Sequence, residues 1–257
     1  AVTLRSTASM PVEWPSDAVR LSVPDWLMAR LSDDLGRDRA IDAIEAMDGP
    51  AEVSVRDDGY IQDRGSQLVV DAVDVQPGDL VLDMCAAPGG KATALASLGA
   101  RVVAADARPS RAGLVARNCE SLDIDPAVLS VVAADGLAPP FVDGTFDVVL
   151  LDAPCSGLGS LRRRPDARWR IEPDDIDSLA ALQCSLVESA LRLVRPGGVV
   201  VYSVCTVTSA ETIGIDDALA ADRGDVVALD PPGAPWEPLG RGALLLPQTA
   251  GTDGMYV

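Results

Sequence analysis

The stretch Leu80-Val81-Leu82-Asp83-Met84-Cys85-Ala86-Ala87-Pro88-Gly89-Gly90-Lys91 decides the fold. It opens as a short apolar run, which predicts a buried strand over residues 80–84. The pair Gly89-Gly90 predicts a tight turn into a helix over residues 89–98, because glycine adopts backbone conformations that other residues avoid. At such a turn the free N–H groups of the helix favour a negatively charged ligand. Many strand-to-helix turns contain two glycines, so the turn alone does not identify the ligand.

Short β-rich runs alternate with longer helical patterns from residue 80 to the C-terminus. This alternation predicts an α/β fold with a mostly parallel Rossmann-like sheet and helices on both of its faces. The helix over 175–194 has the most regular apolar spacing, and Arg195-Pro196-Gly197-Gly198 ends it. The predicted strands cover residues 80–84, 101–105, 128–133, 146–152, 198–204, 226–229 and 254–257, and the predicted helices cover 89–98, 109–122, 175–194 and 209–222.

The N-terminal part of the chain has a different pattern. Residues 1–23 show no apolar period and are interpreted as a leader or linker. Amphipathic spacing then predicts three helices, and an extended piece turns at Asp57-Asp58-Gly59. The helices are expected over residues 24–35, 39–47 and 67–73. We therefore divide the chain into residues 1–23, a small helical region over 24–74 and an α/β domain over 75–257.

Composition argues against several classes of protein. With 257 residues and 48% hydrophobic content, the chain can bury a large core. No apolar run reaches the roughly 20 residues that span a bilayer, and the first residues lack the layout of a signal peptide. The absence of histidine and of closely spaced cysteines argues against a metal site. Five cysteines without regular spacing argue against a disulfide framework, so a reducing cytoplasm is the expected compartment.

The net charge of −18 is unusual for a protein that binds nucleic acid, because neutralised phosphates supply much of the affinity. One dense positive cluster interrupts the acidic chain around Trp169: Arg162, Arg163, Arg164, Arg168 and Arg170. A solvated loop is the simpler interpretation of such a run. Because the cluster begins shortly after Cys155, we interpret it instead as lining the same cleft and as a candidate RNA-binding surface.

Aspartates stand at the carboxyl ends of successive predicted strands, where parallel sheets bind ligands. Asp106 follows Asp83 by roughly 20 residues, the spacing at which an acidic side chain meets a ribose in Rossmann-type units. It could equally cap the helix that begins at Pro109. Asp135 is a candidate partner for an adenine amino group, or a plain turn residue. Together these positions predict a nucleotide-type ligand.

Lys91 is the only lysine in the chain, and every other basic side chain is an arginine. Its place directly after Gly89-Gly90 suggests that the ligand site needs an ammonium group. The alternative interpretation is a surface lysine that is present by chance.

Two cysteines lie just beyond predicted strands. Cys155 lies in Asp152-Ala153-Pro154-Cys155-Ser156-Gly157, and Cys205 lies in Tyr202-Ser203-Val204-Cys205-Thr206. A thiolate adds readily to C6 of a cytosine ring, which activates C5, and sulfur also leaves well afterwards. Asp152 could hydrogen-bond the N3/N4 edge of the base during this addition. The alternative is that both thiols are buried small hydrophobic groups, as we expect for Cys119 and Cys184 within helices.

These motifs together resemble the RsmB/Sun branch of the RNA cytosine-C5 methyltransferases, the family that includes the Nop and NSUN enzymes. The resemblance runs nearly continuously from residue 24 to the C-terminus, and the paired cysteine motifs are its most specific part. The matching stretches are Gln62–Gln67, Asp83–Lys91, Asp106, Asp135, Asp152–Gly157, residues 162–170, Tyr202–Thr206 and Gly251-Thr252-Asp253-Gly254-Met255.

The resemblance implies a class I methyltransferase fold with an antiparallel last strand, S-adenosylmethionine as the cofactor, and RNA, above all 16S ribosomal RNA, as the substrate. It implies that Cys205 is the nucleophile, that Cys155 assists release and that Asp152 supports the base. A monomer without metal or membrane partner is favoured. The implied cofactor contacts are Cys85, Ala86, Ala87, Pro88, Gly89, Gly90, Lys91, Asp106, Arg111, Asp135 and Asp152.

Three departures from the family pattern are expected to matter. We expect no counterpart of the N-terminal RNA-binding domain of bacterial relatives, and only a shortened RNA-recognition subdomain, since four residues separate Val55 from Tyr60. Ala250 stands where relatives often have histidine. Two other functions stay open. One is a methyltransferase of the same fold that acts on a small molecule or protein, which the acidic charge favours, and the other is a non-catalytic RNA-binding relative.

Overall fold

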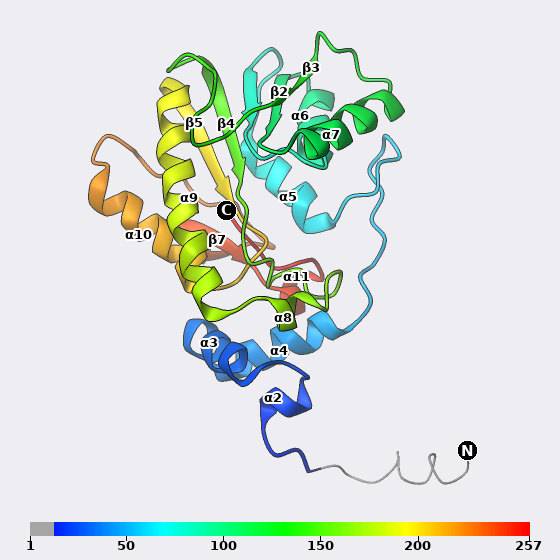
Figure 1. The fold of residues 1–257 in the computed structure, drawn as a ribbon, viewed down its shortest axis with the longest axis vertical. Helices are drawn as coiled ribbons and strands as arrows, with labels where there is room; N and C mark the ends of the chain where they lie inside the picture. The colour runs from blue at the N-terminus through cyan, green and yellow to red at the C-terminus, as the bar shows by residue number, and fades with distance from the viewer. Residues whose placement is uncertain (1–12) are drawn as a thin grey trace.

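The protein is described by a computed structural model over residues 13–257. Its centre is a five-stranded sheet in which every neighbouring pair is parallel, in the order β3-β2-β1-β4-β5 (Figure 1). The α/β class and the parallel sheet are therefore confirmed. The strands are β1 Leu80–Asp83, β2 Arg101–Asp106, β3 Leu129–Ala133, β4 Phe146–Asp152 and β5 Val194–Ser203.

Helices cover both faces of this sheet, because successive strand residues point to opposite sides. Along β4, Val148 and Leu150 belong to one hydrophobic core, whereas Val149 and Leu151 belong to the other. The core that contains Val148 and Leu150 is closed by three helices: α5 Arg64–Val73, α6 Gly90–Ser97 and α7 Pro109–Ser121. The core that contains Val149 and Leu151 is closed by α9 Pro173–Leu193 and α10 Ile213–Asp222. The 3₁₀ turn Ser209–Glu211 precedes α10. Within the described residues no helix is both long and apolar enough for a bilayer crossing.

A second, antiparallel sheet continues from the end of β5. It contains β6 Glu237–Leu239, β7 Gly242–Leu245 and β8 Met255–Tyr256. Val204 and Tyr256 exchange two backbone hydrogen bonds of 3.1 and 2.9 Å, so β8 runs antiparallel to the chain that leaves β5. The predicted antiparallel last strand is confirmed. The strand predicted over 226–229 is wrong: these residues form no strand, and the prolines that follow them cannot donate to a sheet.

The N-terminal region packs as short helices below the sheet in Figure 1. They are α2 Asp17–Arg20, α3 Asp25–Leu35 and α4 Arg37–Asp48. The leader interpretation is corrected where the structure describes it, because Ala18, Leu21 and Val23 are buried in the same core as α3 and α4. A helix of four residues is too short to show an apolar period. Residues 1–12 lie outside the described part of the chain.

Residues 53–61 connect this region to the α/β domain. The chain reverses at Asp57-Asp58-Gly59, as predicted, and Val55 and Ile61 form an isolated antiparallel bridge. Helix α5 then begins at Arg64, and the Asp63 carboxylate caps it by accepting from the N–H groups of Gly65 and Ser66. Short helices α8 Ala167–Arg170 and α11 Pro247–Ala250 complete the fold.

Candidate active site

The predicted motifs meet at the carboxyl edge of the parallel sheet. Asp152 at the end of β4 pairs in register with Ser203 at the end of β5, next to the end of β1. A pocket of about 180 Å³ lies beside Asp152. It is lined by Tyr60, Ile61, Gln62, Asp63, Ser66, Asp83, Cys85, Ala86, Ala87, Pro88, Gly90, Lys91 and Asp152. Most of the predicted cofactor contacts therefore share one pocket.

The turn at Gly89-Gly90 has no room for side chains. Gly89 has a φ of +110°, and a Cβ there would lie 3.0 Å from Val115 of α7. A Cβ on Gly90 would lie 3.1 Å from the Tyr60 ring and 3.2 Å from the Gln62 amide. Glycine at both positions brings the N-terminus of α6 against the pocket, which is how such turns approach an anionic or polar ligand.

The single lysine forms the centre of a polar network. Lys91 Nζ lies 2.6 Å from Asp152 Oδ2, and Ser203 Oγ donates to Asp152 Oδ1 at 2.9 Å. Only 11% of the Lys91 side chain is exposed, so the interpretation as a surface lysine is wrong. Burial opposes the charge of Lys91, but Asp152 outweighs it and the pKa of the lysine is raised.

Asp83 was not predicted as a site residue, although it opens the glycine-rich motif. It lines the pocket, is 1% exposed, and neither of its carboxylate oxygens has a hydrogen-bond partner among the described residues. Burial, and then the nearby Asp152 carboxylate, raise the pKa of Asp83 to about 7. An unpartnered buried carboxylate at a pocket wall is suited to a cationic ligand group.

The two motif cysteines lie side by side, with 3.3 Å between Cys155 Sγ and Cys205 Sγ. A hydrogen bond from Cys155 lowers the pKa of Cys205, and Lys91 acts in the same direction. The pKa of Cys155 is raised well above its ordinary value, because it donates to Cys205 and because burial opposes its charge. The pair therefore favours a thiolate on Cys205. Cys119 is buried in the core, as predicted, whereas Cys184 is only partly buried.

Four predicted cofactor contacts lie outside the pocket walls, namely Gly89 of the turn, Asp106, Arg111 and Asp135. The carboxylate of Asp106 accepts from the backbone N–H of Arg108 at 3.0 Å and from Arg111 Nε at 3.1 Å. Arg111 also donates to the carbonyl of Ala87 at 2.8 Å. Asp135 is exposed and accepts from the backbone N–H of Leu137. The first residue of α7 is Pro109 and its N-cap is Arg108, so Asp106 is not the helix cap. Cofactor roles for these residues, as for those that line the pocket, stay predictions.

Residues 56–60 fold against the glycine-rich turn. Arg56 donates to the carbonyl of Gly90 and to Thr93 Oγ1, and its guanidinium lies 4.9 Å from the centre of the Tyr60 ring. Asn118 of α7 donates to Tyr60 Oη at 3.2 Å. These contacts make Tyr60 a wall of the pocket, which spacing along the sequence did not indicate.

The arginine cluster divides into buried and exposed members. Arg168 is 5% exposed, pairs with Asp48 at 2.8 Å and donates to the carbonyl of Leu21. Arg162 pairs with Asp63 at 3.1 Å and with Asp253 at 2.7 Å. The charges of these two residues are thus used inside the protein, while RNA contacts of the cluster stay a prediction. Arg163 also pairs with the same two aspartates, whereas Arg164 and Arg170 are exposed.

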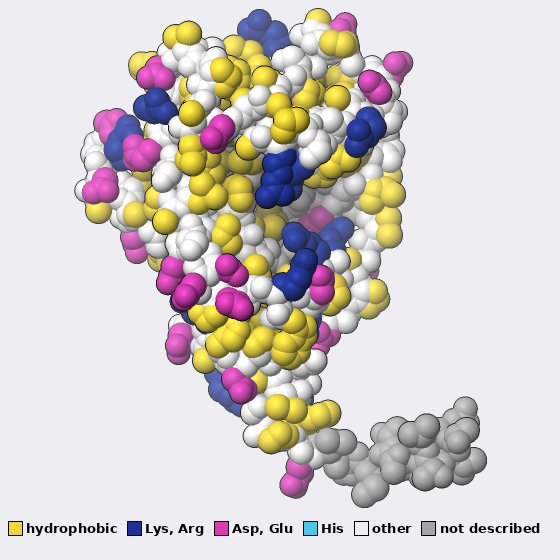
Figure 2. All heavy atoms as spheres, in the orientation of Figure 1, with side chains coloured by type: hydrophobic (Ala, Val, Ile, Leu, Met, Phe, Trp, Pro, Cys, Tyr) yellow, Lys and Arg dark blue, Asp and Glu magenta, His cyan; other side chains and the backbone are white. Residues whose placement is uncertain are grey.

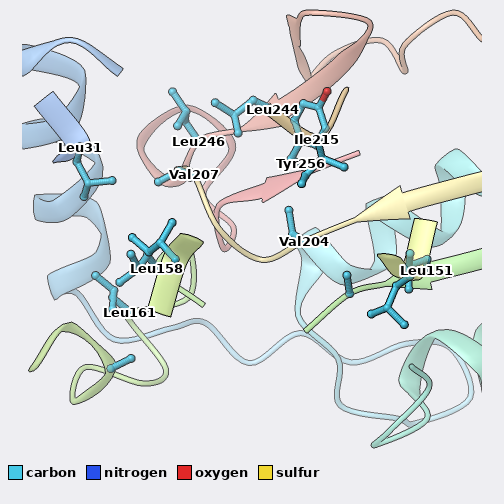
Figure 3. Close-up of a cluster of buried hydrophobic side chains, with 14 of the residues drawn as sticks. Leu31, Leu151, Leu158, Leu161, Val204, Val207, Ile215, Leu244, Leu246 and Tyr256 are labelled. Atoms are coloured by element: carbon cyan, nitrogen blue, oxygen red, sulfur yellow. The ribbon is translucent and has the colours of Figure 1, made fainter. Parts of the chain in front are cut away.

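Figure 2 shows Lys and Arg side chains gathered around a hollow in the middle of one face, while Asp and Glu are scattered over the rest. The chain just before Arg162 is held by close packing. A Cβ on Gly159 would lie 2.1 Å from the carbonyl oxygen of Gly254, and the Gly159 N–H donates to the carbonyl of Cys205. Leu158 and Leu161 enter the same apolar cluster as Leu31 (Figure 3). The chain just after the first cysteine motif therefore contacts both the second cysteine motif and the Gly-Thr-Asp-Gly motif.

Comparison with known proteins gives the same assignment. The family described as 16S rRNA methyltransferase RsmB/F matches residues 70–257. A Mycobacterium tuberculosis protein named as methyltransferase Rv1407 is 46% identical over 218 residues. The match covers 79% of this chain and 46% of that protein. Ribosomal RNA small subunit methyltransferase B of Xylella fastidiosa is 38% identical over 198 residues, 76% of this chain and 47% of that protein. The chain spans about half the length of these relatives.

Solved structures from Pyrococcus horikoshii share the fold. A methyltransferase homolog superposes with a TM-score of 0.75 at 25% identity, covering 95% of this chain and 98% of that one. NSun6, solved with SFG, superposes with a TM-score of 0.64 at 26% identity, covering 77% of this chain and 51% of that one. Together with the family match over residues 70–257, these results show that the chain belongs to the RsmB/F family of 16S rRNA methyltransferases.

Proposed function

We propose that this protein transfers a methyl group from S-adenosylmethionine to C5 of a cytosine in RNA, with 16S ribosomal RNA as the substrate and the cytoplasm as the compartment. The observation that carries the proposal is the pair of thiols, 3.3 Å apart and close to the pocket that holds Lys91 and Asp152. A methyltransferase that uses no covalent adduct needs neither thiol. Family membership and the acid-lined pocket support the choice of cofactor.

The pocket fits such a cofactor by its chemistry. S-adenosylmethionine, when bound, supplies an electrophilic methyl group on a sulfonium. The unpartnered Asp83 carboxylate suits its cationic end, and the backbone at Gly90 admits a ligand close to the start of α6. Asp106 would bind the ribose hydroxyls once Arg111 turns aside, and Asp135 would bind the adenine amino group.

The two thiols divide the covalent chemistry. The Cys205 thiolate forms a bond to C6 of the cytosine. The electron pair of the C5=C6 bond is then delocalised over C5, C4 and N3, which makes C5 nucleophilic. Asp152, held by Lys91 and Ser203, hydrogen-bonds the N3/N4 edge of the base. Once Cys205 is a neutral thioether, its charge no longer opposes ionisation of Cys155. Burial, Glu211 and Asp152 still raise the pKa of Cys155, so loss of its proton to solvent is the demanding part of the release step. After C5 has gained the methyl group that the bound cofactor would supply, the Cys155 thiolate takes the C5 proton, the C5=C6 bond forms again, and Cys205 leaves as a thiolate.

The acidic charge of −18 favours a second candidate, a methyltransferase for a small molecule or a protein. Methyl transfer from labelled S-adenosylmethionine to 16S ribosomal RNA fragments, followed by mapping of the modified base, separates the two. Label at C5 of a cytosine supports the proposal. A folded protein that binds the cofactor and labels only protein or small molecules contradicts it, and binding of RNA without label indicates a non-catalytic relative.

Replacing Asp106 with alanine should weaken cofactor binding. Loss of a hydrogen bond to a charged group costs about 1.5–3 kcal/mol, so we expect the Kd to rise by about 10- to 150-fold in calorimetry. Asp147→Ala is the matched control, because Asp147 also binds a backbone N–H and an arginine but lies at the opposite edge of the sheet. An unchanged Kd for Asp106→Ala would remove its cofactor role.

Neutralising the exposed arginines should flatten the salt dependence of RNA binding. If Arg164 and Arg170 each neutralise one phosphate, each replacement by glutamine reduces the slope of log K against log salt by about 0.7–0.9, and the double variant shows both reductions. The double variant Arg192→Gln/Arg195→Gln is the control, because both side chains are about half exposed near the other edge of the sheet. Equal slopes for the two double variants would show that residues 162–170 form only a surface loop.

A further inference from the structure

One fully buried carboxylate lies beneath the two cysteine motifs. Glu211 is 0% exposed, and its carboxylate accepts five hydrogen bonds. Oε1 accepts from the Ser156 backbone N–H at 2.8 Å and from Gln183 Nε2 at 3.1 Å. Oε2 accepts from the hydroxyls of Ser156 at 2.6 Å, Thr208 at 2.8 Å and Thr206 at 3.2 Å.

No lysine or arginine of the described residues forms an ion pair with Glu211. A buried charge without a counter-ion is costly, and here only these hydrogen bonds offset the cost. Three of the five donors belong to residues that directly follow a cysteine, since Ser156 follows Cys155 and Thr206 follows Cys205. The carboxylate therefore fastens both cysteine loops to one point.

The support extends to α9. Gln183 also donates to the carbonyl of Pro154 at 2.8 Å, just before Cys155. Tyr202 Oη bridges this amide and the Glu211 backbone, at 3.1 Å to Gln183 Oε1 and 2.7 Å to the Glu211 carbonyl. Each group in the network has a partner, so the arrangement is rigid.

We propose that Glu211 is a positioning residue, whose buried charge sets the separation and orientation of the Cys155 and Cys205 thiols. Its effect on methyl transfer rests on the function proposed above, but its effect on the thiols does not. A disulfide forms when oxidised glutathione takes two electrons and two protons from the paired thiols and leaves as two molecules of reduced glutathione. The equilibrium of this exchange measures how closely the protein holds the two sulfurs.

The test is a glutathione redox titration of the full chain, with the Cys155–Cys205 disulfide quantified by mass spectrometry. The variant Glu211→Gln keeps the shape of the side chain but removes its charge. The effective concentration of the two thiols should fall at least about tenfold in this variant, because a displacement of about 1 Å between reacting groups can lower a rate about 100-fold. Thr208→Val, which removes one donor at nearly constant shape, should move in the same direction, and Thr208→Ser should restore the wild-type value.

Asp216→Asn is the matched control. Asp216 is a partly buried carboxylate that binds Arg241 and forms no hydrogen bond with either cysteine motif. It should lower the melting temperature and leave the thiol equilibrium unchanged. An effective concentration within about twofold of wild type in Thr208→Val and in folded Glu211→Gln would overturn the proposal. If the wild type methylates RNA, Glu211→Gln should reduce kcat by about 100-fold with little change in cofactor Kd. If the wild type methylates no RNA, the titration still decides the role of Glu211.

Discussion

Replacing Cys205 with alanine should abolish both methyl transfer and any covalent complex between protein and RNA. Without this thiol no nucleophile reaches C6, and C5 of an unactivated cytosine does not attack a methyl donor. The expectation is specific to Cys205, because its pKa is lowered by the hydrogen bond from Cys155 and by Lys91. The measurement is label transfer to a single-stranded or loop cytosine, since the base must leave its stack to react.

The Cys155→Ala variant should behave in the opposite way. Loss of the hydrogen bond from Cys155 raises the pKa of Cys205 and slows its attack, but attack and methyl transfer still occur, and removal of the C5 proton becomes the slowest step. A covalent protein–RNA species should therefore accumulate and be visible on a denaturing gel. Its amount should depend on the cofactor, because the trapped species forms after methyl transfer.

Cys119→Ala and Cys184→Ala are the controls, since both thiols lie in helices and neither forms a hydrogen bond with Cys155 or Cys205. They should retain methyl transfer and form no trapped species. If Cys155→Ala loses the adduct and Cys205→Ala accumulates it, the two roles are reversed and the mechanism proposed for this chain is wrong.

Replacing Lys91 with methionine should have the next largest effect. A neighbouring opposite charge changes a pKa by about 1–3. Lys91 is paired with Asp152 and is not the largest influence on Cys205, so we expect the lower end, a fall of about tenfold in the thiolate fraction of Cys205 at neutral pH. The sign is definite: removal of the cation raises the pKa of Cys205, so the loss of activity is greatest at low pH and recovers as the pH rises. The measurement is single-turnover methyl transfer between pH 6 and about pH 10.

The stability of the Lys91→Met variant separates two roles of Lys91: activation of Cys205 and pairing with Asp152. Removing one partner of a buried pair leaves the other charge unpaired and costs about 3 kcal/mol in the free energy of unfolding. The double variant Lys91→Met/Asp152→Asn should recover much of this loss, because the unpaired carboxylate is then neutral. It should not recover activity. Full activity in Lys91→Met at low pH would exclude Lys91 from activation of Cys205.

The local motifs were readable from the chain because each depends on short-range chemistry. Gly89 needs a positive φ, β-rich runs alternate with helical ones, and Cys155 and Cys205 each follow a strand. Parallel strands place their carboxyl ends at one edge, so a shared site followed from the order of elements. The spacing of these residues and their backbone conformation depend mainly on neighbours along the chain.

The predictions that the structure corrects concern residues whose partners are distant along the chain. Arg168 looked like a free cation, but its charge is taken up by Asp48 and by the carbonyl of Leu21. Residues 16–23 looked like a linker because their burial depends on α3 and α4. Glu211 carried no sequence signal beyond its place after the second cysteine motif.

The amino-acid sequence by itself determined the α/β class, the glycine-rich turn and the two thiols, since these follow from periodicity, backbone freedom and residue chemistry. Only the tertiary structure decided that the two sulfurs lie 3.3 Å apart, that Lys91 is paired with Asp152, and that Asp83 is buried without a partner. Such features depend on desolvation and on contacts between segments 50 or more residues apart, as between Cys155 and Cys205. Burial changes the energy of a charge far more than sequence neighbours do, and burial is a property of the fold.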